Sequence, residues 1–120
     1  MKKDDLGVFL EIYGNTILNR VWEFLLIRLD LDFAIGDMAR EQKISRPKAY
    51  EAITRFERKG YVSKSRIIGR TQMYKLNLNH RIVKIYRNNF LECLKLSLEE
   101  ASEAKNYGGA DVGAVSTRQM

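Results

Sequence analysis

The sequence predicts a mainly α-helical domain with a small β-hairpin, an α+β fold, from three observations. The chain has 120 residues, of which 45% are hydrophobic, and this is enough for one small core. Apolar residues recur at helical spacing over most of the chain. Between residues 61 and 78 they alternate instead, around Gly69-Arg70, a pair typical of a two-residue hairpin turn. We therefore expect helices on both sides of a single hairpin.

Two helices are expected before residue 30. The first is capped by Asp4 or Asp5 and ends at Gly14. The second begins at Asn15 or Thr16 and has apolar residues on more than one face, which predicts that it is the most buried helix.

A short extended piece and a short helix follow within residues 32–45. We expect Gly36 or Asp37 to begin this helix. Met38 and Ala39 then face the core, while Arg40 and Lys43 face outward.

A stronger helical signal covers residues 45–59. Ser45 is a good N-cap, Pro47 suits a first turn because the amide it lacks has no helical partner there, and Gly60 ends the helix. The first turn also holds Arg46 and Lys48, although the positive end of a helix dipole favours acids. These cations suggest a polyanion beyond the helix end. One face is apolar and predicted to be buried: Ala49, Ile53 and Phe56.

Residues 61–78 predict a hairpin with Gly69 first in a type II′ turn. A regular register from this turn pairs Ile68 with Thr71 and continues until Lys64 faces Lys75. Like charges in direct opposition cost about 0.2–1 kcal/mol, which a phosphate between them would remove. The face expected to cover the core collects Tyr61, Ile67, Tyr74, Leu76 and Leu78.

A long last helix completes the expected domain, residues 1–105. Asn79 is its expected N-cap. Residues 106–120 carry three glycines and little hydrophobic weight, and we expect a disordered tail there. The long helix has a broad apolar stripe: Ile82, Val83, Tyr86, Phe90, Leu94 and Leu98.

The charge of the chain is concentrated in one window. Ten basic residues and two acids lie between Lys43 and Lys75, a net charge of +8. Because the whole chain has a net charge of +6, the remainder sums to −2. A local basic patch of this kind points to nucleic acid as a partner.

Several other classes find no support in the sequence. Glu23 and Arg28 interrupt the longest apolar run, so no membrane span is expected. Cys93 is the only cysteine and His80 the only histidine, so we expect no disulfide and no metal site, and a cytoplasmic location. A glycine-rich phosphate loop, paired carboxylates and a nucleophile with a base are all missing, so we expect neither a cofactor nor catalysis.

The order of helix, short helix, turn, helix, hairpin and long helix is that of a winged helix-turn-helix. Over roughly residues 15–100 the chain resembles the MarR, ArsR and TrmB-like transcription regulators, especially archaeal ones. The resemblance lies in "IGDMAREQKISRPKAYEAITRFERKGYV" and "GRTQMYKLN".

The resemblance implies that the helix over 45–59 enters the DNA major groove and that the hairpin over 61–77, the wing, meets the minor groove or backbone. It also implies a homodimer through the N- and C-terminal helices. We expect no second, ligand-sensing domain of the kind that larger TrmB-like proteins carry. The positions that match expected DNA contacts are Ser45, Arg46, Pro47, Lys48, Tyr50, Thr54, Arg55, Lys64, Arg66, Arg70, Thr71 and Gln72.

Elementary chemistry suggests a role for several of these residues. Ser45 and the first helical amides suit a phosphate oxygen. Arg46 or Lys48 can donate to guanine, and Tyr50 can meet a base edge or a thymine methyl. Arg70 at the hairpin tip is suited to the minor groove.

The prediction is therefore a homodimeric, sequence-specific regulator of transcription that binds double-stranded DNA, associated with the nucleoid. The homodimer is also favoured by the surplus of large apolar residues on the first and last helices. Two alternatives stay open. One is a chromosomal or plasmid-partition protein that coats DNA, and the other is a winged-helix module that binds another protein.

Overall fold

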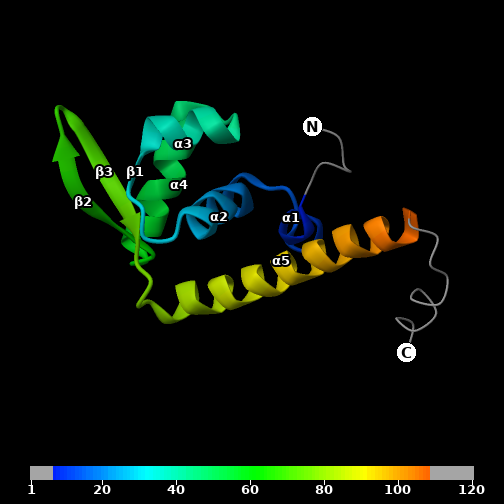
Figure 1. Cartoon of the computed structure of the whole chain (residues 1–120). Coiled ribbons are helices and arrows are strands. Elements are labelled where there is room, and N and C mark those ends of the chain that lie inside the picture. The colour runs from blue at the N-terminus through cyan, green and yellow to red at the C-terminus, as the bar shows by residue number, and fades with distance from the viewer. Residues whose placement is uncertain (1–6, 109–120) are drawn as a thin grey trace.

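The computed structural model describes residues 7–108, which form five helices and a three-stranded antiparallel sheet (Figure 1). This confirms the expected α+β fold. The elements in chain order are α1 (Val8–Tyr13), α2 (Ile17–Arg28), β1 (Phe33–Ala34), α3 (Ile35–Gln42), α4 (Arg46–Arg58), β2 (Val62–Ile68), β3 (Thr71–Leu76) and α5 (Arg81–Gly108).

The core lies where α2 meets α4 and α5. The Trp22 indole stacks on the Tyr86 ring of α5, with 3.9 Å between ring centroids, and lies 4.8 Å from the Phe56 ring of α4. As expected, α2 is deeply buried, because its apolar residues occupy more than one face. Its buried residues are Val21, Trp22, Phe24, Leu25 and Leu26. On α4, the predicted stripe of Ala49, Ile53 and Phe56 is buried together with Ala52.

Two of the expected helix starts are confirmed. Thr16 caps α2 by accepting a hydrogen bond from the Asn19 amide. Ser45 caps α4, since its hydroxyl oxygen accepts from the Lys48 amide at 3.3 Å, and Pro47 lies in the first turn.

Three other expected starts are wrong. Gly7 is the N-cap of α1, while Asp4 and Asp5 lie outside the described residues. The helix α3 begins at Ile35 rather than at Gly36 or Asp37, because β1 runs directly into it. The side-chain cap of α5 comes from His80 and not Asn79, since His80 Nδ1 accepts from the Ile82 amide at 3.0 Å.

The hairpin is part of a larger sheet than expected, with strand order β1-β3-β2. The short extended piece became β1, whose Phe33 pairs with Tyr74. Near the turn, the register is as predicted, with Ile68 opposite Thr71. The turn itself has φ +63° at Gly69 and no positive φ at Arg70, as in a type II′ turn.

Farther from the turn, the predicted register is wrong, because an irregularity between Lys64 and Ile67 shifts β2. Lys64 lies opposite Tyr74, not Lys75, so the expected repulsion between two opposed lysines does not arise. Ile67 was expected to cover the core, but it is 66% exposed. Ile67 still lies opposite Gln72 as predicted, so its exposure follows from its place near the turn; the bulge instead brings Val62 opposite Leu76, where both are buried.

The last helix is longer than expected. It passes residue 105 and ends at Gly108, and the rest of the expected tail, 109–120, lies outside the described residues. In Figure 1, α5 runs away from the wing and passes beside α1. None of the described helices has the length and hydrophobicity needed to cross a membrane.

Candidate nucleic-acid interface

The first turn of α4 presents its polar residues to solvent. Arg46, Pro47 and Lys48 are exposed while the neighbouring Ala49 is buried. Tyr50 follows one turn later and is 49% exposed. Because Ala49, Ile53 and Phe56 hold the opposite face of the helix in the core, this set of side chains faces outward.

A groove separates the start of α4 from the wing, and we call it the α4–wing groove. Its volume is about 470 Å³. Arg46 and Tyr50 border it from α4, whereas Arg70, Thr71 and Gln72 border it from the wing. The remaining lining residues are Ala34, Ile35, Gly36, Asp37, Arg40 and Tyr74.

The side chain of Tyr74, on β3, lies close to residues of α4. Burial raises the pKa of the Tyr74 hydroxyl, and the charges of Glu57 and then Tyr50, both on α4, raise it further. Phe33 lies beside Tyr74 on the neighbouring strand and is buried. The base of the wing is therefore packed against the body of the domain, which holds the groove walls in place.

Arg40 and Asp37 in this groove were not among the predicted site residues. Arg40 was expected to face outward, and it does so on α3, where it forms an ion pair with Asp37. Their place beside Arg46 follows from the packing of α3 on α4, which spacing along one helix does not indicate. The groove thus holds three arginines, at positions 40, 46 and 70, and one acid.

Other predicted site residues lie outside the α4–wing groove. Arg66 donates through Nε to the Asp32 carboxylate at 2.8 Å, and Ser65 donates to the same carboxylate at 3.0 Å. These three residues border a separate hollow together with Lys75. Arg55 borders a third hollow, between α4, α2 and α5. Lys64 and Thr54 are exposed but border none of these hollows.

The contact with Arg66 and Ser65 changes the pKa of the Asp32 carboxyl. The hydrogen bond from Arg66 is the largest cause and lowers the pKa of Asp32; burial opposes it, and the bond from Ser65 then lowers the pKa further. The guanidinium of Arg66 stays exposed, with 65% of its side chain accessible. Arg66 is therefore partly neutralised on one side and open to solvent on the other.

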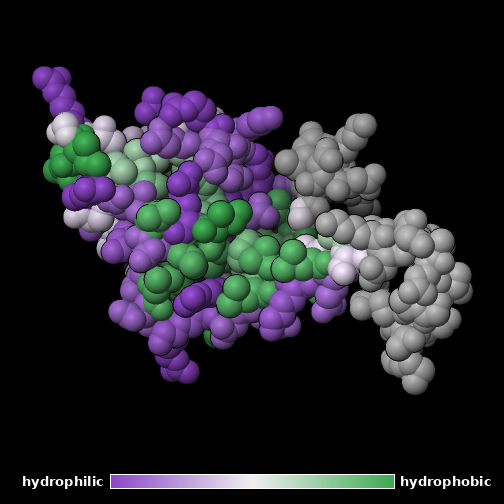
Figure 2. All heavy atoms as spheres, in the orientation of Figure 1, coloured by the Kyte–Doolittle hydropathy of each residue, from purple (hydrophilic) through white to green (hydrophobic). Residues whose placement is uncertain are grey.

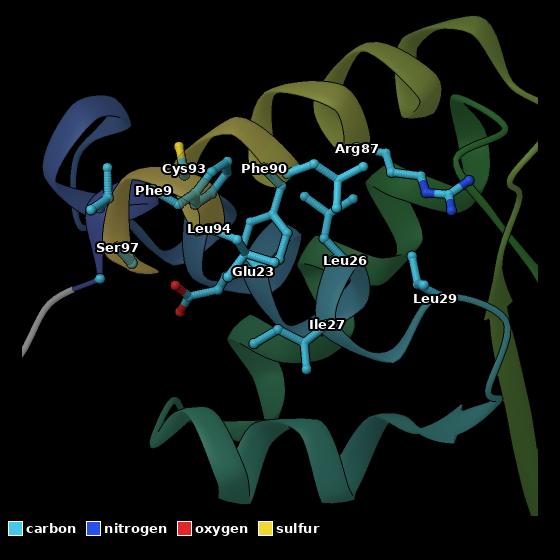
Figure 3. Close-up of a pocket in the computed structure, with 13 residues that line it drawn as sticks. Phe9, Glu23, Leu26, Ile27, Leu29, Arg87, Phe90, Cys93, Leu94 and Ser97 are labelled. Atoms are coloured by element: carbon cyan, nitrogen blue, oxygen red, sulfur yellow. The ribbon is translucent and has the colours of Figure 1, made fainter. Parts of the chain in front are cut away.

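An apolar hollow lies far from the wing, between α1, α2 and α5 (Figure 3). Its volume is about 380 Å³, and Phe9, Leu26 and Phe90 contribute to its walls. Glu23 points into it, and burial raises the pKa of this carboxyl. Burial likewise raises the pKa of the Cys93 thiol in the wall, as expected for a small packed residue.

The next question is whether side chains in the described part of the chain could bind a metal ion. Among the side chains that the structure describes, those of residues 7–102, no cluster of three or more His, Cys, Asp or Glu residues could hold a metal ion. The α4–wing groove instead carries three arginines, whose guanidinium groups donate and are suited to phosphates and base edges.

Solved structures of regulators share this fold. The structure of a mutant of ZitR from Lactococcus lactis in complex with DNA has a TM-score of 0.57 at 14% identity over 73% of this chain. The chain spans 60% of that protein. AdcR, the adhesin competence repressor of Streptococcus pyogenes, has a TM-score of 0.59 at 14% identity, covering 83% of this chain and 74% of its own.

A third similar structure is a transcriptional regulator homologue from Pyrococcus horikoshii, with a TM-score of 0.51 at 19% identity over 76% of this chain and 88% of its own. The sequence itself matches no family model and no curated protein. With the element order described above, these likenesses identify a winged-helix fold.

Proposed function

We propose that this protein is a sequence-specific, double-stranded DNA-binding regulator of transcription of the MarR, ArsR or TrmB-like type. In this proposal α4 enters the major groove and the wing contacts the adjacent minor groove or backbone. The observation that carries it is the α4–wing groove, where Arg46, Arg40 and Arg70 converge from three elements. The complex of ZitR with DNA supports the same use of a similar fold.

Within this arrangement, each donor has a chemical role. In the first turn of α4, the Lys48 and Ala49 amides donate to Ser45 and Pro47 has none, which leaves the Arg46 amide for a phosphate, while the Arg46 side chain is suited to a guanine edge. Arg70 at the exposed tip is suited to a narrow minor groove. Arg66, Lys64 and Arg55 lie outside the α4–wing groove and would contact the backbone on its flanks.

A homodimer through the terminal helices completes the proposal. Hydrophobic side chains gather along α5 and toward α2 in Figure 2. On α5, Ile85 is 56% exposed and Leu98 is 70% exposed, and Ile12 on α1 is 60% exposed. A symmetric pair would cover these residues and the apolar hollow of Figure 3. Two copies of α4 would then meet successive major grooves about 34–36 Å apart.

Selection of bound duplexes from a random pool tests the proposal. A regulator of this kind is expected to retain a palindrome with a fixed spacing and to protect a bounded footprint. If no palindrome emerges and the footprint grows with protein concentration, the protein coats DNA instead. If no duplex is retained, the result favours the alternative in which the winged helix binds another protein.

A further inference from the structure

Gly36 lies in the first turn of α3, where the guanidinium of Arg46 occupies the space that a side chain would need. A Cβ atom at this position would lie 2.7 Å from Arg46 Nη2 and 3.3 Å from its Cζ. Cβ atoms essentially never come closer than 3.0 Å to another heavy atom. The absence of a side chain at residue 36 therefore permits the observed position of Arg46.

Neither backbone conformation nor helix stability accounts for glycine at this position. Gly60 and Gly69 have positive φ angles, which favour glycine, whereas Gly36 does not. Inside a helix, glycine is less favourable than alanine, because it loses more conformational freedom. The close approach of Arg46 is a physical reason for glycine here.

We propose that Gly36 is a positioning residue for DNA recognition: it lets the Arg46 guanidinium lie across the first turn of α3, inside the α4–wing groove. This proposal rests on the proposed function. In that position, Arg46 borders the groove against Gly36 of α3, while Arg70 borders the same groove from the wing. The side chain at residue 36 thereby determines which base edge or phosphate Arg46 reaches.

The substitution Gly36→Ala separates binding from folding. The colliding atoms belong to the far end of a flexible side chain, so the guanidinium can move away without disrupting the backbone. Alanine also favours a helix. We therefore expect a melting temperature equal to or above that of the unsubstituted protein, together with weaker and altered DNA binding.

A double-mutant cycle on the duplexes retained by the unsubstituted protein tests this inference. Gly36→Ala is expected to weaken binding about fivefold or more, which is the lower range for one arginine–base contact. In an Arg46→Ala background, the same change should alter affinity less than about twofold, because the displaced group is gone. Asn79→Ala is the control and should leave affinity unchanged, because Asn79 is exposed and borders neither the α4–wing groove nor the apolar hollow of Figure 3.

A second measurement does not depend on DNA. The chemical shift of the Arg46 Nε–H should change in Gly36→Ala and stay constant in Asn79→Ala. The inference is overturned if Gly36→Ala leaves both this resonance and the affinity unchanged, or if it weakens binding equally with and without Arg46. If the unsubstituted protein retains no duplex at all, the proposed function is wrong, and the positioning role of Gly36 is then wrong as well.

Discussion

At the residue scale, the backbone is strained at Lys43, in the turn between α3 and α4. Lys43 ends α3 in the left-handed conformation, with φ +57° and ψ +44°, and this lets the chain reach Ser45 and begin α4. A left-handed conformation costs an L-residue about 1–2 kcal/mol relative to its preferred one. The tight turn between α3 and α4 is thus built with some strain at an exposed lysine.

Lys43→Gly is expected to stabilise the fold by about 0.5–1 kcal/mol, because relief of this strain exceeds the extra entropy that glycine loses on folding. Chemical denaturation measures the change in the free energy of unfolding. Lys84→Gly, at an exposed position inside α5, is the matched control and should destabilise by about 1 kcal/mol. Equal losses in the two variants would rule out strain at Lys43.

The Asp32 carboxylate is expected to titrate below the usual range of an aspartate, because Arg66 and Ser65 donate to its charged form. Since the folded-state pKa is lowered, this contact contributes stability above the unfolded pKa of about 3.9 and loses it as the pH falls through the folded value. Carboxyl NMR measures the titration. Arg66→Ala should return the pKa of Asp32 most of the way to its usual value, and Ser65→Ala less far.

At the element scale, local patterns predicted the helices better than the sheet. Periodicity placed α2 and the buried stripe of α4, since each depends on residues within one helix. The turn at Gly69 and the adjacent pair Ile68–Thr71 also followed from neighbouring residues. The bulge in β2 did not, because Asp32, distant in sequence, binds Ser65 and Arg66 within it. Likewise, Arg40 reaches the α4–wing groove only through the packing of α3 on α4.

The start of α5 gives a direct test of one corrected expectation. His80→Ala should destabilise the fold by about 0.5–1 kcal/mol, because it removes the acceptor for the Ile82 amide and an edge-on contact with the Tyr61 ring. Asn79→Ala should cost less than about 0.5 kcal/mol, since its bond to Asn77 uses the backbone amide, which alanine keeps. Thermal melts of both variants compare them; a larger loss for Asn79→Ala would contradict this assignment.

At the scale of the whole molecule, the α4–wing groove and the apolar hollow of Figure 3 lie in different regions, although Ile67 and Ile68 are also exposed on the wing. The α4–wing groove collects arginines at one end, and the apolar residues of α1, α2 and α5 border the hollow of Figure 3 elsewhere. One region would serve DNA and the other a second copy of the chain. Two quantities can therefore be measured separately: the affinity of one copy for DNA, and the dimerisation that lets two linked copies bind the same duplex.

Leu94→Glu is expected to weaken dimerisation, because Leu94 is 44% exposed beside the apolar hollow and a buried carboxylate would lack a partner. A loss of about 2 kcal/mol, roughly thirtyfold in the dimer dissociation constant, should appear in sedimentation at several concentrations. Leu31→Glu is the control, since Leu31 is 62% exposed in the loop before β1. Identical sedimentation of both variants would remove α5 from the proposed interface.

The most direct test of the central claim, that the α4–wing groove grips the DNA backbone and bases, is the salt dependence of binding to a duplex. With roughly six to ten phosphate contacts per dimer, log affinity should fall with log salt at a slope near −0.9 per contact. Arg70→Ala should weaken binding to all sequences and make this slope shallower, while Lys84→Ala on α5 should change neither. A flat salt response, or an unchanged slope in Arg70→Ala, would contradict the claim.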